Sequence, residues 1–548
     1  MAAVPAGLVL FTLALIAAWL VVDPRTPDLA AQVYRVGLFH QQGFALWDNN
    51  WYAGHDLLGY SLLYPPLASL VGMRLLGALC VLQSTLLFER LARLAFGEVA
   101  RWGAAWFALA ALGDVWSGQM TFALGVSMAL AAALALAYER WLWAALLAAL
   151  CAAASPVAGA LLGLAGLTLT LWRRSPRVLA VLAGPAAVVV LVLVALFPEG
   201  GYEPYPILSF AATMLVVLTF LWALPARARL LQLGASVYVL ACVGCLLVHS
   251  PMGSNVERYA MLAGPLLACA VLDAGDGRRH SGDGRDRSSG GGRPLSAWRS
   301  AACWRWRVGP VAALALCVSA VWVVWGPVRE TEAVAGSEAT SAPYYAPVKH
   351  FLAEQHGGPV RVEVPLTRSH WEAAELAPTV SLARGWDKQL ETRFNDVLLR
   401  PGLSATSYDR WLHEQAVTYV ALPDVKLDPS SAQEGRLIDG GVPYLRQVFS
   451  SAHWRIFRVL EPTPLASGPG TLTSLSHASF VLFARARGTF LVRVHFTRYW
   501  AITSGSGCVA PAPGGWTAVR VRSPGTAVVS ASFSLGRAFS SGGSCAGG

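Results

Sequence analysis

Residues 23–61 contain the densest group of side chains suited to acid–base and phosphate chemistry. Within the stretch DLAAQVYR, Asp28, Gln32 and Arg35 fall on one face of a helix. A carboxylate there can deprotonate an acceptor hydroxyl or hold a metal ion. A guanidinium beside it can neutralise a leaving phosphate through paired hydrogen bonds. These residue types would suit group transfer from a phosphate-linked lipid donor, with the carboxylate of Asp28 as base or metal ligand and the guanidinium of Arg35 on the donor phosphate.

The same segment also supplies polar and aromatic side chains that suit sugar binding. Aromatic rings stack on sugar faces, and a few polar groups fix the orientation of a ligand in its pocket. We predict that five residues contact substrate, namely Gln32, His40, Asp48, Trp51 and His55. The alternative is structural, because tryptophans favour the membrane interface and carboxylates outside a membrane are simply solvated.

Two later segments add candidates of the same kinds. The sequence GDVWSGQMTFALG contains a further carboxylate, Asp114, which either takes part in the chemistry or caps a helix end. Asp28 and Asp114 together are the predicted ligands of a divalent metal, Mg²⁺ or Mn²⁺.

The segment HSPMGSNVERYA supplies His249 as a substrate contact and Arg258 as a second ligand of the donor phosphate. An arginine at the start of an apolar run can also make one of two other interactions. It can pair with Glu257, or it can extend to lipid headgroups.

Membrane helices are expected to hold these segments in place. Of the 548 residues, 55% are hydrophobic and only 14% are charged, against about 25% charged in soluble domains. This balance excludes an ordinary cytosolic enzyme and a disordered chain. About eleven apolar runs are candidate spans, although Arg74 suggests that part of 61–74 is a separate interfacial helix. The runs are 5–22, 66–88, 101–114, 121–137, 142–155, 157–172, 178–197, 207–224, 230–248, 259–272 and 308–326.

Arginine and lysine gather in alternate loops between these runs. They are frequent in 89–101, 173–177 and 273–307 and sparse in 113–120 and 198–206. The positive-inside rule then places the N-terminus in the cytoplasm and the C-terminal part outside it, in a multi-pass protein of the plasma membrane. We attribute the net charge of +10 to this topology and predict no nucleic-acid partner.

Three domains are predicted. Residues 1–326 form the membrane domain, interrupted by a Gly-, Ser-, Asp- and Arg-rich cytoplasmic linker at 273–307 that cannot bury a core. Residues 327–465 mix helical and strand patterns, which indicates an α/β domain: helices at 344–355 and 407–415, and strands at 360–366, 416–424 and 453–461.

Residues 466–548 are rich in strand patterns and predict a small β subdomain. The stretches SFVLFARARGTFLVRVHFT and WTAVRVRSPGTAVVSASFSL each read as a hairpin with a glycine-bearing turn. Cys508 and Cys545 form a disulfide in an oxidising compartment, or stay as two unpaired thiols. The His and Trp pairs of 369–388 suggest a sugar site, but we favour a packed domain surface there.

The order of these features resembles the GT-C superfamily of membrane glycosyltransferases. The shared features are a first span, a long outside loop with an early aspartate, a "W…G…YPP" stretch and many further spans. The chain is most similar to YfhO-like proteins, and the pair Asp28 and Arg35 resembles the loop of oligosaccharyltransferase catalytic subunits. GDVWSGQMTFALG is similar to the start of the fourth span in such enzymes, and this resemblance makes Asp114 the second catalytic carboxylate. AVTYVALPD is similar to a strand of their post-membrane domain.

This resemblance implies transfer of a sugar from a polyprenyl-phosphate donor, at the membrane, to an envelope glycan, lipid or protein. It assigns the catalytic or metal-binding carboxylate to Asp28. Two alternatives remain open. An inactive relative serving as an envelope scaffold predicts a filled cavity or separated carboxylates. A transporter predicts a central pathway between two similar halves.

Overall fold

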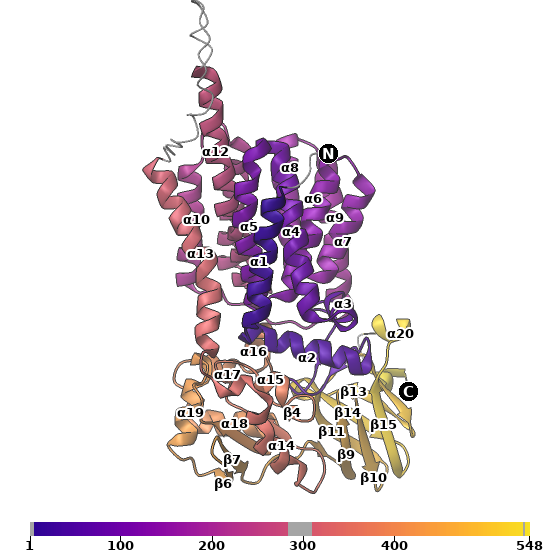
Figure 1. The fold of residues 1–548 in the computed structure, drawn as a ribbon. Helices are drawn as coiled ribbons and strands as arrows, with labels where there is room; N and C mark the ends of the chain where they lie inside the picture. Colours follow the sequence, from indigo (N-terminus) through magenta and orange to yellow (C-terminus); the bar gives the residue numbers. More distant parts are fainter. Residues whose placement is uncertain (1–4, 283–308, 541–542, 548) are drawn as a thin grey trace, which may run out of the picture.

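The structure, a computed structural model, describes residues 5–282, 309–540 and 543–547. A bundle of apolar helices stands on a C-terminal domain that contains all but two of the described strands (Figure 1). The predicted class is therefore confirmed: a polytopic helical membrane part followed by an α/β and a β part. The bundle helices are α1 Ala6–Val22, α4 Met73–Phe96, α5 Ala100–Trp116, α6 Met120–Ala137, α7 Trp141–Ala154, α8 Pro156–Arg173, α9 Pro176–Leu196, α10 Ile207–Ala223, α11 Arg229–Leu247, α12 Ala263–Gly282 and α13 Pro310–Val334.

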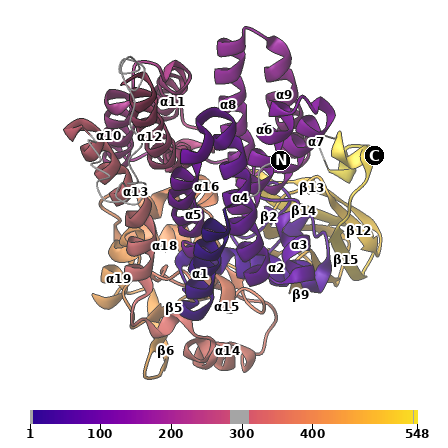
Figure 2. The same cartoon turned by 45° about the horizontal axis from the view of Figure 1, so that its top comes forward.

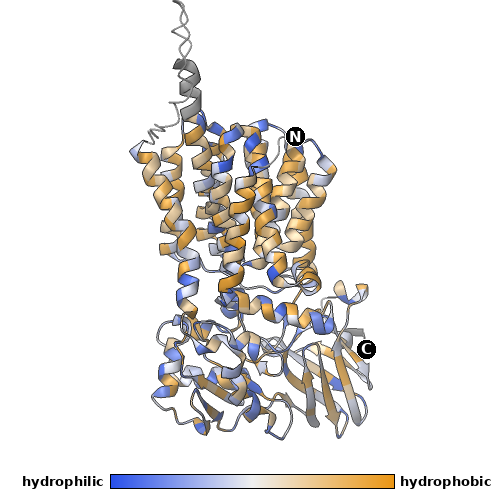
Figure 3. Cartoon of the chain, viewed as in Figure 1, coloured by the Kyte–Doolittle hydropathy of each residue, from blue (hydrophilic) through white to orange (hydrophobic). Residues whose placement is uncertain are grey.

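Each predicted apolar run corresponds to one of these helices, except that 66–88 begins in the separate helix Tyr64–Val71 and continues in α4. Among the described residues, six helical segments are long and apolar enough to cross a membrane, or seven if α1 and the bent helix after it count as one. One of the six is Met73–Trp116, which a 3-10 turn at Gly97–Val99 divides into α4 and α5. The chain is a multi-pass membrane protein, as the hydrophobic residues that predominate in the bundle helices also indicate (Figure 3). The number of spans stays a prediction.

Two short helices cross the end of the bundle that faces the C-terminal domain (Figure 1). α2 (Pro27–Gln42) leaves α1 at an angle of 82° and begins with a proline, whose fixed φ suits the first helical position. α3 (Tyr64–Val71) is separated from α4 by Gly72, which has a φ of +86°. The separate helix expected around Arg74 is therefore present, and Arg74 itself pairs with Asp23 at the end of α1.

The bundle helices form two groups beside α4 and α5. Helices α6 to α9 lie on one side and α10 to α13 on the other (Figure 2). α12 continues to Gly282, so it includes the first part of the predicted linker. Residues 283–307 of that linker lie outside the described residues.

The first part of the C-terminal domain is a five-stranded mixed sheet of order β4-β3-β5-β7-β6. β3 is parallel to β4 and β5, and the pairs β5–β7 and β7–β6 are antiparallel. The predicted helices and strands of 344–461 are all present. The elements are α14 Ala346–Ala353, β3 Arg361–Glu363, α15 Glu372–Glu375, β4 Ser381–Leu382, α16 Lys388–Phe394, α17 Asp396–Leu399, α18 Ala405–Glu414, β5 Tyr419–Pro423, α19 Ala432–Asp439, β6 Leu445–Ser450 and β7 Trp454–Val459.

The second part is a sandwich of two four-stranded sheets, of order β12-β15-β10-β9 and β13-β14-β11-β8. The strands pack their apolar faces around Phe480, Phe490 and Trp500. The elements are β8 Ala466–Ser467, β9 Gly470–Ser476, β10 Ser479–Ala484, β11 Gly488–His495, β12 Trp500–Ser504, β13 Gly507–Pro511, β14 Trp516–Val521, β15 Gly525–Ala531 and α20 Leu535–Ala538.

The two predicted hairpins are wrong. β10 pairs with β15 and β9, whereas β11 pairs with β14 and β8, so the turn between β10 and β11 crosses from one sheet to the other. β14 and β15 are likewise in different sheets. Alternation of apolar residues identifies a strand with one buried face, but it does not identify the partner strand.

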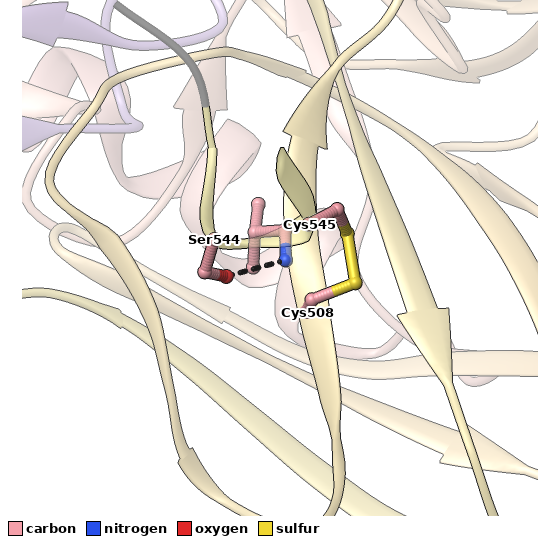
Figure 4. The surroundings of a disulfide bond; sticks show 4 residues. Cys508, Ser544 and Cys545 are labelled. Atoms are coloured by element: carbon pink, nitrogen blue, oxygen red, sulfur yellow. Dashed lines mark hydrogen bonds between the residues drawn. A yellow bond between two sulfur atoms is a disulfide. The ribbon is translucent and has the colours of Figure 1, made fainter. Parts of the chain in front are cut away.

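The disulfide between Cys508 and Cys545 is confirmed, with a Cα–Cα distance of 5.0 Å (Figure 4). It joins β13 to the C-terminal tail. The hydroxyl of Ser544 accepts a hydrogen bond from the backbone N–H of Val509 beside it, at 2.9 Å.

Candidate functional site

An apolar cavity of about 340 Å³ lies within the bundle. Its walls come from α4, α5 and α6, from α8, from α10 to α12, and from η2, the 3-10 segment Gly253–Leu262. Among the described side chains that line it, Arg258 of η2 is the charged one, and its guanidinium lies 5.1 Å from the ring centroid of Phe122. The described lining of the cavity is thus apolar, with the guanidinium of Arg258 as its charged group.

Asp28 lies in the first turn of α2, within the electrostatic reach of Arg258. Burial raises the pKa of Asp28 above its ordinary value of 3.8, and the charges of Arg258 and His370 and a hydrogen bond from Trp386 oppose that rise. The helix N-terminus further favours the carboxylate over the neutral acid. A carboxylate with a raised pKa, held beside cations, is suited to accept a proton.

The loop between α5 and α6 fixes the start of α2. Gly118, with a φ of +80°, approaches so closely that a Cβ there would stand 2.3 Å from the backbone nitrogen of Leu29. Thr26 donates from its hydroxyl to the carbonyl of Trp116 at 3.1 Å, and the indole of Trp116 donates to the Thr331 hydroxyl at 2.8 Å. Asp28 is therefore positioned by contacts from both α5 and α13.

Asp114 lies in the last turn of α5 and shares Arg258 with Asp28. Arg258 is the charged group that acts on it, and its Oδ2 atom is buried without a hydrogen-bond partner. Asp114 does not cap the next helix, because the N-cap of α6 is Gln119 and forms no side-chain cap bond. Three of the predicted residues are thus linked electrostatically: Arg258 acts on both Asp28 and Asp114.

Four residues at this site were not among the sequence candidates. His370 stacks on Trp386 with ring centroids 3.4 Å apart, and its Nε2 lies 3.5 Å from the carboxylate of Asp428. Arg329 and Glu330 pair at 2.9 Å near the end of α13, and both interact electrostatically with Asp28. The His and Trp pairs of 369–388 had suggested a sugar site that includes His370 and Trp386. We did not select these residues because we interpreted the segment as a packed domain surface.

The described residues contain no group of three or more His, Cys, Asp or Glu side chains that could hold a metal ion. Magnesium in transferases is usually held by one or two protein carboxylates together with substrate phosphates. Asp28 and Asp114 fit only that limited role. The predicted Mg²⁺ or Mn²⁺ stays a prediction.

The second half of the same loop is used in packing against the C-terminal domain. Asp48, in the short strand β1 (Trp47–Asp48), accepts hydrogen bonds from the Tyr34 hydroxyl at 2.7 Å and from Nδ1 of His477 at 2.9 Å. Trp51 stacks on Tyr34 with centroids 4.5 Å apart and donates from its indole to the carbonyl of Ala373 at 3.1 Å. Asp48 and Trp51 are fully buried, so neither offers a surface to a substrate.

His55 is in β2 (His55–Asp56), which pairs with β1. Its Nδ1 donates to the carbonyl of Asp56 at 3.0 Å, and burial lowers its pKa to about 4. The ring is therefore neutral at pH 7. Its Nε2 is buried and has no hydrogen-bond partner.

Arg35 is committed to an ion pair rather than to an open site. One of its guanidinium nitrogens lies 2.9 Å from the carboxylate of Asp387, with both side chains at least 94% buried. The guanidinium also stacks 3.7 Å above the ring of Tyr60, whose hydroxyl accepts from Gln32 at 3.0 Å. Asp387 is the N-cap of α16, so this pair ties α2 to the C-terminal domain.

Two predicted histidines lie away from Asp28. His40 is in the last turn of α2, about 18 Å along the helix from Asp28, and its Nδ1 is 3.1 Å from the Ser69 hydroxyl. His249 is exposed just after α11 and packs edge-on against Tyr202. Their roles in substrate binding stay predictions.

No family model and no curated protein matches this chain. Among solved structures, the arabinofuranosyltransferase AftD from Mycobacteria aligns at 15% identity with a TM-score of 0.43, over 99% of this chain and 58% of AftD. ArnT from Cupriavidus metallidurans aligns at 15% identity with a TM-score of 0.43, over 82% of this chain and 97% of ArnT. The oligosaccharyltransferase AglB from Archaeoglobus fulgidus aligns at 12% identity with a TM-score of 0.30, over 76% of this chain and 69% of AglB. This chain thus spans little more than half of AftD. Because the TM-scores are below 0.5, we argue function from this chain's own residues.

Proposed function

We propose that this protein is a GT-C-type glycosyltransferase that moves a sugar from a polyprenyl-phosphate donor to a cell-envelope acceptor outside the cytoplasm. One observation carries the proposal. Arg258 lines the apolar cavity and is also the charge that acts most strongly on both Asp28 and Asp114. The proposed phosphate ligand thus lines the cavity and interacts electrostatically with the proposed base.

The cavity suits the isoprenoid part of the donor. Its lining is hydrocarbon from several helices, and each buried CH₂ group contributes about 0.8 kcal/mol to binding. The guanidinium of Arg258 suits the phosphate, because it keeps its charge and offers several donors in one plane. Arg35, which the sequence suggested for this role, is already paired with Asp387.

In the proposed step, Asp28 removes the proton from an acceptor hydroxyl as its oxygen attacks the anomeric carbon of the donor sugar. The bond between that carbon and the phosphate oxygen breaks. Polyprenyl phosphate leaves with one more negative charge, which Arg258 stabilises. Asp114 helps to hold Arg258 in place, and Asp28 returns its proton to solvent after the product leaves.

The inactive scaffold is less well supported than the enzyme. We expected a scaffold to have a filled cavity or separated carboxylates. The cavity is open, and Asp28 and Asp114 share one arginine. The topology follows the arginine count: a cytoplasmic N-terminus, with the site and the C-terminal domain outside.

The test is transfer by the purified protein in lipid, with a panel of radiolabelled polyprenyl-phosphate sugars and an envelope-lipid extract. Asp28→Asn is compared with Asp439→Asn, an exposed aspartate on α19 that pairs with Arg455. We expect transfer by wild type and Asp439→Asn and a loss of about 10²- to 10⁴-fold in Asp28→Asn, the usual contribution of a general base. Equal transfer by Asp28→Asn would refute the assignment of the base.

A further inference from the structure

The end of the β-sandwich nearest the bundle carries an exposed apolar tip. This tip consists of Phe533, Leu535 and Phe539, which flank and include the short helix α20. Leu535 is 71% exposed and Phe539 is 83% exposed. Large apolar side chains this exposed indicate a surface that another apolar phase covers.

The tip is attached to the outer end of a membrane helix. Ala538 of α20 packs with Tyr499 in one cluster with Leu193 and Phe197 at the end of α9. The Tyr499 hydroxyl donates to the carbonyl of Leu196 at 2.8 Å. The last turns of α9 themselves expose Val188, Leu191, Val192 and Val194, as expected of a lipid-facing helix. The tip therefore continues the lipid-facing surface of α9 beyond the end of that helix.

Other interfacial elements lie at the same level. α20 lies at the level of α2 and α3, at the junction between the bundle and the C-terminal domain (Figure 1). Leu70 of α3 is 81% exposed, and Phe44, just after α2, is 57% exposed. Exposed apolar side chains thus occur at this level on three separate elements of the chain.

The tail is fixed in this position from both sides. β15 ends at Ala531, just before the tip, and the disulfide at Cys545 follows it and returns the chain to β13. Arg498 donates to the carbonyl of Ala538 at 2.7 Å, and Arg537 hydrogen-bonds to the backbone carbonyl of Ser532. With these contacts in place, the side chains of Leu535 and Phe539 stay exposed at the surface of the protein. Two arginines at the base of an apolar tip suit the headgroup region of an anionic bilayer.

We propose that the α20 tip inserts into the bilayer surface and anchors the β-sandwich to the lipid around α9. The occupant of this surface is phospholipid: acyl chains against Leu535 and Phe539, and headgroup phosphates near Arg498 and Arg537. The anchor fixes the sandwich against the membrane independently of any transfer chemistry.

The test places a photo-crosslinking amino acid at position 539 of the full chain, in vesicles of radiolabelled phosphatidylethanolamine and phosphatidylglycerol. The matched control is position 483, a phenylalanine of the same sandwich that is 45% exposed. Phe483 pairs with Thr526, at the end of β15 remote from α20 and about 17 Å from Ala531. Formation of the Cys508–Cys545 disulfide verifies the fold of each variant.

We expect labelled lipid on position 539 at about tenfold or more above position 483, since burial of one large apolar side chain corresponds to at least that factor. Equal lipid labelling at the two positions would overturn the anchor. So would cross-links from position 539 that join two copies of the protein and carry no lipid.

Discussion

The two halves of the loop 23–61 carry similar residue types and put them to different uses. Asp28, in the first half, interacts electrostatically with Arg258, which lines the cavity, and its carboxylate accepts a hydrogen bond from Trp386. Asp48, in the second half, is fully buried and accepts hydrogen bonds from Tyr34 and His477. An aspartate in a membrane-surface loop is therefore not by itself a sign of chemistry. What distinguishes the two is their surroundings: Asp28 is under the charges of Arg258 and His370, whereas Asp48 is held in packing by Tyr34 and His477.

The largest effect that this comparison predicts on folding concerns the ion pair between Arg35 and Asp387. Asp387→Asn retains a good N-cap but leaves the Arg35 guanidinium buried without its counter-ion. We expect the free energy of unfolding to fall by about 3–5 kcal/mol, the usual cost of breaking a buried pair. Denaturant titration in detergent micelles measures it.

Asp396→Asn is the control for that experiment. Asp396 pairs with Arg400 at the surface of α17, with side chains 40% and 74% exposed. Its replacement should cost no more than about 1 kcal/mol. If Asp387→Asn were equally mild, then Arg35 would be free for the phosphate role that the sequence suggested.

The next effect concerns the position of Asp28 rather than its charge. Gly118→Ala would place a Cβ against the backbone of Asp28 and Leu29 at a φ of +80°, so the start of α2 must move. We expect the transfer rate to fall about tenfold or more, because small displacements of a catalytic group cost that much. Gly43→Ala is the matched control. Gly43 also has a positive φ, +68°, but has nothing within 4 Å of its added Cβ. An equal loss in both variants would mean that backbone strain, and not the displacement of Asp28, is responsible.

The smallest predicted effect is a shift in the pH dependence of the transfer rate. Asp28 must be deprotonated to act as a base, so the rate is lost as the pH falls through its pKa. Burial raises that pKa and Arg258 opposes the rise. Arg258→Gln should therefore move the acid limb of the pH–rate profile to higher pH, apart from any drop in maximal rate. A shift to lower pH, or none, would show that Arg258 does not act on the catalytic base.

The sequence was sufficient for the fold where burial patterns are local. Every apolar run became a helix, and the strand at 416–424 and the helix at 407–415 are present. The pairing of β10 with β11 was wrong because partner choice depends on distant strands. The turns after Ala484 and Val521 cross between sheets instead of closing hairpins.

Candidate site residues could be selected only where their own local sequence is unusual. Asp28, Asp114 and Arg258 could be selected as candidates because charges are rare near membrane spans, and their roles stay predictions. His370 and Trp386 were missed because they reach the site from the C-terminal domain, more than 300 residues away in the sequence. The ion pair of Arg35 with Asp387 could not be predicted, because Asp387 is equally distant in the sequence.

The most direct test of the central claim compares the two aspartates of the one loop. Single-turnover transfer from a labelled polyprenyl-phosphate sugar is measured for wild type, Asp28→Asn and Asp48→Asn, each corrected for its folded fraction. We predict that Asp28→Asn keeps its stability and loses about 10²- to 10⁴-fold in rate. Asp48→Asn should lose about 1.5–3 kcal/mol of stability and keep its rate per folded molecule. A rate lost through Asp48→Asn and kept in Asp28→Asn would contradict the account.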